Sequence, residues 1–303
     1  YLVSYGVFQD RFGEAMSVKR PERSADPEER EELRAVQESL HQLVSPFILR
    51  RLKQDVLKDL PDKIITDIPC AMTPEQQALY RRHLGYARRQ ISAFDAAEGR
   101  ERGRKRMDIL GELTRLRQIC CDPALFVPGY DGGSGKLDAL EDLVNNLTES
   151  GHRILLFSQF TSMLKIIKER QEKQGRQVLY IDGQVPSKER LKLVSHFNAG
   201  EGEVFLISLK AGGTGLNLTG ADVVIHYDPW WNPAVENQAT DRAHRLGQRK
   251  VVQVFRMVTK GSIEEKIQEM QQRKQALLDD IVAPGATFIN RMDLDDIREL
   301  FAE

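Results

Sequence analysis

The chain has 303 residues, 41% of them hydrophobic and 29% charged, and its formal net charge is −1. This composition is ordinary for a soluble globular protein, and the length allows more than one compact unit. A net charge so close to zero excludes binding to nucleic acid through overall charge, so any such binding must use local patches. The three cysteines lack the spacing of a structural zinc site. The chain contains no stretch of about 18 apolar residues, which is the length that would predict a membrane span.

The first part of the chain is predicted to be mainly helical. It starts at Tyr1 without an initiator methionine or a signal peptide, and we expect it to be the interior of a longer protein. Asp26-Pro27 and Thr73-Pro74 each offer an N-cap followed by a first-turn proline. The expected elements are a helical stretch over 26–57 that Pro46 ends or kinks, a strand over 64–70, a helix over 73–94 and a helix that ends at 121. We expect the basic run at 100–106 to lie in a loop of this helical subdomain.

After a Gly-, Asp- and Pro-rich linker at 127–135, strands and helices alternate. The expected helices cover 136–150, 161–174, 187–199 and 234–246, and the expected strands cover 153–158, 178–182, 204–209, 223–227 and 251–258. Short, continuously apolar strands of this kind predict an α/β fold, in which a parallel sheet has helices on both faces. A final amphipathic helix is predicted over 262–282, followed by an acidic amphipathic segment over 293–301.

The segment Gly132-Gly-Ser-Gly-Lys136-Leu137 has only a superficial likeness to a phosphate-binding P-loop. Such a loop needs glycine at position 130 and serine or threonine at position 137, where this chain has Tyr130 and Leu137. It also precedes a helix without following a strand. We therefore interpret the segment as a linker and helix cap.

Two segments that follow predicted strands carry candidate ligand groups. The turn after strand 204–209 contains Lys210, Gly213, Thr214, Gly215 and Asn217, and closely spaced glycines let backbone N–H groups approach an anion. An ordinary strand–helix turn explains the same glycines. Ser158 and Gln159 place polar donors beside a helix start, which suits a backbone phosphate but equally suits a helix cap.

Two adjacent tryptophans and a basic run are further candidates for contact with nucleic acid. Trp230 and Trp231 follow strand 223–227 in a loop bracketed by prolines. Either both pack in the core, or one of them stacks against a nucleic-acid strand. In the basic run, Arg104 and Lys105 are the best candidates for a phosphate contact, although most such runs are solvated helix faces.

The stretch at 236–248 places Arg242 and Arg245 three residues apart, close to one face of the predicted helix 234–246 and beside Gln238. Arginine keeps its charge, and its planar fork matches phosphate oxygens. A paired set is suited to stabilising charge on the γ-phosphate of a nucleotide. Because the chain has no phosphate-cradling loop, this segment is interpreted as half of an active site.

Three blocks together resemble the Swi/Snf-type DNA translocase ATPases, which belong to a helicase superfamily with two RecA-like lobes. The blocks are 154–160, 208–218, and 227–233 continuing through 238–248, and the segments 47–53, 116–123 and 261–265 are also similar. The resemblance implies a RecA-like second lobe with a helical insertion. It divides the chain into a lead-in (1–62), a strand plus helical protrusion (63–126), the lobe itself (127–260) and a bracing helix with a tail (261–303).

The resemblance also implies a role for each candidate residue. Arg242 and Arg245 resemble arginine fingers, with Gln238 on the same interface, and they reach ATP and Mg²⁺ that the other lobe mainly holds. Gly213, Gly215 and Asn217 are the implied cofactor-binding residues, and Asn217 would couple the nucleotide site to the DNA site. The residues that resemble DNA contacts are Ser158, Gln159, Lys210, Thr214 and Trp231. The implied partners are double-stranded DNA, the chain's own first lobe and a DNA-bound protein, and the implied location is the cytoplasm or, in a eukaryote, the nucleus.

Because the P-loop and the Asp-Glu box of the first lobe are absent, we expect this chain alone not to hydrolyse ATP. A stand-alone module that binds nucleic acid or protein without ATPase activity is the alternative. An unrelated doubly wound enzyme would need a small-molecule site, and the sequence offers no nucleophile, acid–base pair or metal set for one.

Overall fold

The computed structural model describes residues 60–95, 99–212, 215–280 and 294–301, together with Ala35 and Ser39. The chain forms two compact units, Tyr1–Lys58 with Leu278–Thr287, and Asp59–Leu277 with Phe288–Glu303. Nearly all described residues lie in the second unit. The helical stretch predicted over 26–57 and the similar segment at 47–53 fall outside the described residues.

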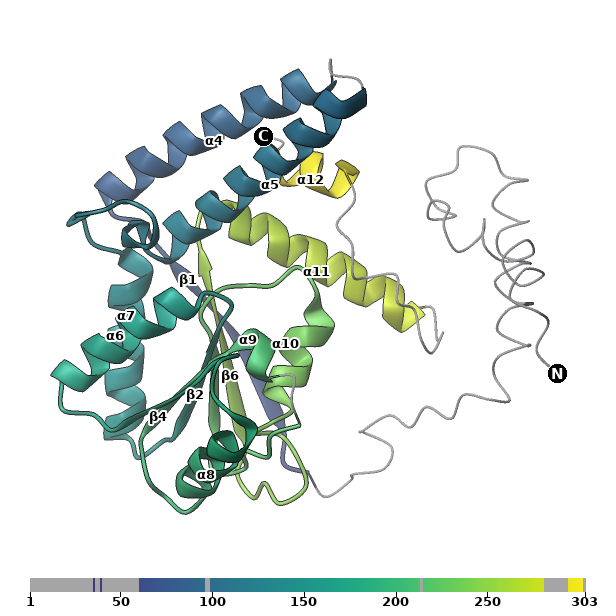
Figure 1. Cartoon of the computed structure of the whole chain (residues 1–303). Coiled ribbons are helices and arrows are strands. Elements are labelled where there is room, and N and C mark those ends of the chain that lie inside the picture. Colours follow the sequence, from purple (N-terminus) through teal and green to yellow (C-terminus); the bar gives the residue numbers. More distant parts are fainter. Residues whose placement is uncertain are drawn as a thin grey trace. The chain divides into compact units, whose positions relative to one another are not determined.

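Six parallel strands form one sheet in the second unit (Figure 1). The strands are β1 Lys63–Cys70, β2 Ile154–Ser158, β3 Val178–Ile181, β4 Val204–Ser208, β5 Val223–His226 and β6 Val252–Thr259. Their order is β1-β6-β5-β2-β4-β3, and every pairing is parallel. The predicted α/β fold with a parallel sheet is therefore confirmed. The early strand β1 joins the same sheet as an edge strand beside β6.

Helices cover both faces of the sheet because successive residues of each strand point to opposite sides. In β2, Ile154 and Leu156 pack with α6 (Gly135–Glu149) and α7 (Thr161–Lys173). Leu155 and Phe157 of the same strand pack into the opposite core. That core also contains residues of α8 (Ser187–Asn198), α9 (Leu209–Gly212) and α10 (Pro233–Thr240). Continuous apolar strands are explained by this burial on both sides.

A separate hydrophobic cluster joins four helices. They are α4 (Pro74–Asp95), α5 (Gly99–Cys121), α11 (Ile263–Asp280) and α12 (Leu294–Phe301). In Figure 1, α4 and α5 run side by side, and α12 lies beside them. A hydrogen bond from Arg88 Nε to the carbonyl of Phe301 (3.1 Å) ties α12 to α4. The helices predicted over 73–94, up to 121 and from 262 are confirmed.

The basic run at 100–106 lies within α5, so its prediction as a loop is wrong. Arginine, lysine and glutamate are good helix formers, and the local propensity of the run therefore supports a helix. The helix extends through the run into its apolar part, where Leu113 and Leu116 pack against α4 and α11.

The caps confirm two local interpretations. Thr73 and Gln76 exchange the two hydrogen bonds of a capping box, each 3.2 Å long. Ser134 caps α6 by accepting the N–H of Leu137 (3.3 Å), as expected for a linker and helix cap. Lys136 is fully buried and pairs with Glu264 of α11, which differs from the exposed lysine of a P-loop.

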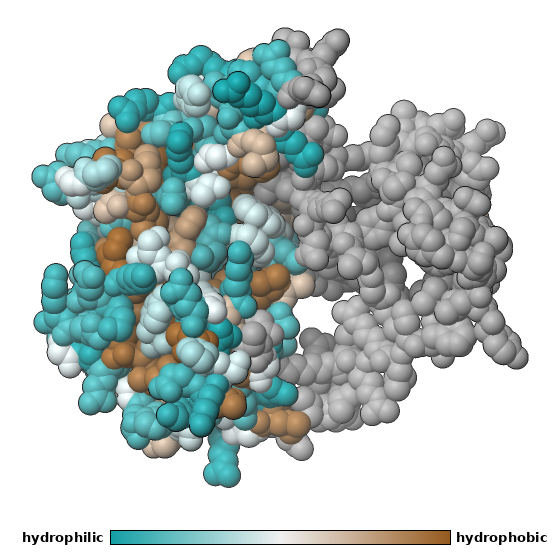
Figure 2. All heavy atoms as spheres, in the orientation of Figure 1, coloured by the Kyte–Doolittle hydropathy of each residue, from teal (hydrophilic) through white to brown (hydrophobic). Residues whose placement is uncertain are grey.

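The surface and the cysteines bear on the class of protein. On the face shown in Figure 2, the described hydrophobic residues lie in small groups between hydrophilic ones. Among the described residues, no helix is long and apolar enough to cross a membrane. The three cysteines, Cys70, Cys120 and Cys121, are buried and form no disulfide.

Candidate functional site

The carboxyl ends of β2 and β5 meet at Asp228. The two strands are neighbours, so the residues that follow them lie side by side. The Ser158 hydroxyl donates to Asp228 Oδ1 (2.5 Å), and the N–H of Gln159 lies 3.3 Å from the same oxygen. Burial raises the pKa of the Asp228 carboxyl, while Arg117 and the Ser158 hydroxyl act in the lowering direction. Ser158 is only 1% exposed, so its hydroxyl serves Asp228 in this structure, and Gln159 is half-buried.

Arg117 of α5 connects Asp228 to the two tryptophans. Its Nη2 lies 3.4 Å from Asp228 Oδ2 and donates to the carbonyl of Pro229 (2.6 Å). The guanidinium also lies 4.8 Å from the ring centre of Trp231 and 5.4 Å from that of Trp230. The indole rings are 4.2 Å apart and inclined by 32°. Both tryptophans are half-buried, so they do not both lie fully in the core, which was one of the two alternatives expected from the sequence.

The sequence reasoning assigned no role to Arg117. A signal was available, because Leu113, Leu116 and Cys120 are apolar at helical spacing and Arg117 shares their face. A charged residue on a buried helix face needs a partner, which directs attention to an acidic residue elsewhere.

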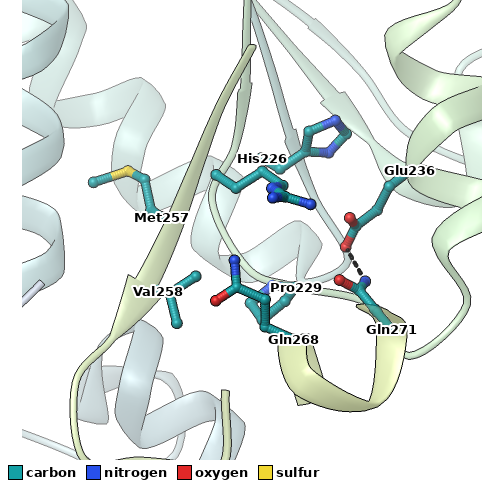
Figure 3. A pocket seen from close by; sticks show the side chains of 8 residues that line it. His226, Pro229, Glu236, Met257, Val258, Gln268 and Gln271 are labelled. Carbon is teal, nitrogen blue, oxygen red and sulfur yellow. Dashed lines mark hydrogen bonds between the residues drawn. The ribbon is translucent and has the colours of Figure 1, made fainter. Parts of the chain in front are cut away.

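A small hollow lies next to the tryptophan loop (Figure 3). Its lining residues are His226, Pro229, Glu236, Arg256, Met257, Val258, Gln268 and Gln271. Glu236 Oε1 accepts the N–H of Trp230 (2.6 Å) and Gln271 Nε2 (2.9 Å). Burial raises the pKa of Glu236 to about 7, and burial lowers the pKa of His226 to about 3. His226 is therefore neutral at physiological pH, and Glu236 holds the loop through the backbone N–H of Trp230.

The prediction that Arg242 and Arg245 lie on a helix is wrong. Helix α10 ends at Thr240, six residues before the expected end, and Arg242 and Arg245 lie in the turns that follow. The carbonyl of Arg242 accepts the N–H of Leu218 (2.9 Å), and the carbonyl of Ala243 accepts Gln248 Nε2 (3.2 Å). The α-helical pattern stops earlier, because the N–H groups of Arg242 and Ala243 bond to carbonyls only three residues before them.

The two arginines differ in exposure and influence each other. Arg242 is 8% exposed, whereas Arg245 is exposed. Burial lowers the pKa of Arg242, and the positive charge of Arg245 acts in the same direction. Gln238 on α10 is exposed. His244, between the arginines, contacts the carbonyl of Pro61 through Nε2 (2.7 Å). The negative charge of Asp241 acts on the pKa of Arg242 in the direction opposite to burial.

The glycine-rich turn is fixed to the arginine segment. Beyond the Leu218–Arg242 bond, Gln248 Nε2 donates to the carbonyl of Ala221 (2.7 Å). Gly215 has φ +66°, a conformation that glycine adopts without strain. Asn217 is exposed, and Lys210 is exposed on α9. Gly213 and Thr214 lie outside the described residues.

The tryptophan loop and the arginine segment lie at opposite ends of the strands. Asp228 and the tryptophans follow the carboxyl end of β5, whereas Ala221 and Gln248 lie just before the amino ends of β5 and β6. A four-residue strand such as β5 spans about 13 Å, and this length separates the two ends.

The basic run lies on α5. Arg104 is exposed, and Lys105 Nζ donates to Gln90 (3.3 Å). In the described part of the chain, no group of three or more His, Cys, Asp or Glu residues could hold a metal ion.

Comparison with known proteins defines the class. The model of the helicase conserved C-terminal domain matches residues 135–247, and that of the SNF2-related domain matches residues 2–125. Together with the parallel sheet, these matches identify a RecA-like lobe of the helicase type.

Solved structures narrow the class to a family. The Sulfolobus solfataricus SWI2/SNF2 ATPase C-terminal domain is 33% identical, with a TM-score of 0.61, over 79% of this chain and 98% of that one. The core of that ATPase in complex with double-stranded DNA is 33% identical, with a TM-score of 0.63, over 98% of this chain and 60% of that one. The chain belongs to the SWI2/SNF2 ATPase family and corresponds to its C-terminal lobe.

Curated relatives are longer than this chain. A mouse SWI/SNF-related matrix-associated actin-dependent regulator of chromatin, subfamily A member 1, is 38% identical over 82% of this chain and 24% of its own length. The chain spans about a quarter of the length of the curated relatives it matches.

Proposed function

We propose that this chain is the second lobe of an ATP-driven motor that translocates on double-stranded DNA. The observation that carries the proposal is the hydrogen-bonded union of the arginine segment with the glycine-rich turn, through the carbonyl of Arg242 and the side chain of Gln248. A segment that meets nucleotide and a loop that meets DNA would then move as one body. The solved family member in complex with double-stranded DNA supports this choice of partner.

In this proposal Arg242 and Arg245 stabilise the γ-phosphate of ATP, with Gln238 at the same interface. The first lobe mainly holds ATP and Mg²⁺. Burial and the charge of Arg245 lower the pKa of Arg242, and an anion beside this guanidinium would favour its charged form. Gly215 and Asn217, with Gly213, link the nucleotide to the DNA side through the turn they share.

The proposed DNA surface joins exposed groups from several elements. Lys210 and Gln159, with Thr214, would contact the phosphate backbone, and Trp231 would contact the groove. Ser158 would contribute through its hold on Asp228, because its hydroxyl is buried. Arg104 and Lys105 on α5 would reach phosphates further along the duplex.

The wider setting of the motor follows from the same proposal. The lead-in over 1–62 would connect to the first lobe, 63–126 would be a strand plus the helical protrusion, 127–260 the second lobe and 261–303 the bracing helix and tail. A DNA-bound protein would be the load that the motor displaces. The motor would work in the cytoplasm or, in a eukaryote, in the nucleus.

The decisive experiment uses the protein with both lobes. We expect Arg242→Ala and Arg245→Ala each to lower DNA-stimulated ATP hydrolysis by about 10³-fold or more, as loss of an arginine finger does in related phosphoryl-transfer enzymes. Binding of duplex DNA should persist. Arg249→Ala, at an exposed arginine of the same loop, is the matched control and should retain turnover. Turnover that survives both finger substitutions would show that the assignment is wrong.

The isolated 303-residue chain should not hydrolyse ATP, since its arginines have no bound nucleotide to complete. A phosphate-release assay with and without duplex DNA measures this directly. Robust DNA-stimulated release by the purified chain would contradict the division of labour between the lobes.

A further inference from the structure

We propose that Arg117 is the positioning residue that fixes the tryptophan loop, residues 228–231, and thereby sets how this loop meets double-stranded DNA. The contacts of Arg117 carry the first part of the inference. The second part rests on the proposed function, in which Trp231 contacts DNA.

Arg117 reaches the loop from a different part of the fold. It belongs to α5 of the helical cluster, whereas the loop follows strand β5 of the sheet. The side chain is 1% exposed, and its Nη2 meets both Asp228 Oδ2 (3.4 Å) and the carbonyl of Pro229 (2.6 Å). One guanidinium therefore holds the first two residues of the loop.

Aromatic rings surround the same guanidinium. The ring centres of Trp231, Trp230 and Phe160 lie 4.8, 5.4 and 5.7 Å from its central carbon. A cation is attracted by ring faces, most strongly when both are removed from water. The Nε of Arg117 is buried and has no hydrogen-bond partner in the part of the chain that the structure describes. The rings thus provide much of the stabilisation for this buried cation.

Lysine could not reproduce this arrangement. Its ammonium is a compact, strongly hydrated point charge, whereas the arginine plane can stack on rings and donate along its edge at the same time. Arg117→Lys keeps the charge beside Asp228 and removes the flat surface. The orientation of the indoles should therefore depend on the guanidinium plane and not on charge alone.

The two tryptophans should depend on Arg117 to different degrees. The N–H of Trp230 is held by Glu236 and its carbonyl by Gln271, from α10 and α11. Trp231 is the closer of the two to Arg117 and packs against the helical cluster from which Arg117 comes. Loss of the guanidinium should loosen Trp231 more than Trp230.

The chain has only two tryptophans, so its fluorescence reports this loop directly. Trp230→Phe leaves Trp231 as the single reporter, and Trp231→Phe leaves Trp230. In each background, acrylamide quenching and the emission maximum are measured with and without Arg117→Lys. We expect quenching of Trp231 to rise at least twofold with a shift to longer wavelength, and quenching of Trp230 to change much less.

Two further variants keep the test decisive. Arg115→Lys, at an arginine of α5 whose side chain is 52% exposed, is the control and should leave both reporters unchanged. Asp228→Asn weakens an anchor of Arg117 with little change of volume, and this variant should also loosen Trp231. If Arg117→Lys shows no thermal unfolding transition, Asp228→Asn takes its place in the test. Unchanged quenching of Trp231 in a folded Arg117→Lys or Asp228→Asn chain overturns the inference.

Binding to a fluorescein-labelled duplex tests the second part. We expect Arg117→Lys to weaken binding by roughly five- to tenfold, at the low end of the range that a single aromatic contact supplies. A loosened Trp231 with unchanged affinity refutes the link to DNA. Trp231→Ala distinguishes the causes: if it binds DNA as tightly as the wild type, the proposed Trp231 contact fails, while the quenching result still decides whether Arg117 fixes the loop.

Discussion

Replacing Glu236 by glutamine should change how the stability of the chain depends on pH. Burial raises the pKa of this carboxyl from 4.5 to about 7, against the lowering effect of its hydrogen bonds from Trp230 and Gln271. The folded chain therefore binds the proton more tightly than the unfolded chain does. The stability that Glu236 contributes is complete below about pH 4.5 and is lost as the pH rises to about 7. About 2.5 pKa units at roughly 1.4 kcal/mol each amount to about 3 kcal/mol at most.

Glutamine has nearly the same shape and carries no charge at any pH. Its carbonyl oxygen can accept the two N–H groups that Glu236 Oε1 accepts now. We expect E236Q to match the wild type at about pH 4.5 and to exceed it by about 2–3 kcal/mol at about pH 8. Urea unfolding followed by circular dichroism across this range measures the difference. Glu189→Gln, at a half-exposed glutamate of α8, is the control and should show no such trend. A difference between E236Q and the wild type that stays constant with pH would refute the reasoning.

Two further predictions concern the packing beneath the site. Lys136→Met leaves Glu264 buried without its cation and should lower the free energy of unfolding by about 3–5 kcal/mol. A Lys136→Met/Glu264→Leu double variant should recover most of this loss, and urea unfolding measures both changes. Gly135→Ala places a Cβ 2.0 Å from a backbone carbonyl oxygen and should lower the melting temperature, whereas Gly111→Ala, with open space around its Cβ within α5, should raise it slightly. Equal melting temperatures for these two alanine variants would contradict the close packing at Gly135.

Much of the fold could be predicted because local sequence carries it. The strands at 154–158, 204–208 and 223–226 are apolar up to their last residue, and each is buried on both faces. Caps such as Thr73 and Ser134 use side chains within three residues of the groups they satisfy. Interactions of this range are visible in any window of sequence.

The arginine segment could not be predicted in the same way. Its helix ends at Thr240, and the carbonyl of Arg242 then bonds to Leu218, which lies 24 positions earlier in the chain. Arg117 meets Asp228 across 111 positions. Helical periodicity places Arg117 on a buried face but contains no information on which partner, at such a separation, it meets.

The burial of all three thiols makes the chain suitable for site-specific labelling. Burial raises the pKa of Cys70, Cys120 and Cys121, so few thiolates form at neutral pH and reagents cannot reach them in the folded chain. A cysteine introduced at Leu191 of α8, which is 65% exposed, would then be the reactive thiol. A fluorophore attached there could follow the distance from this lobe to a labelled duplex with every native cysteine in place.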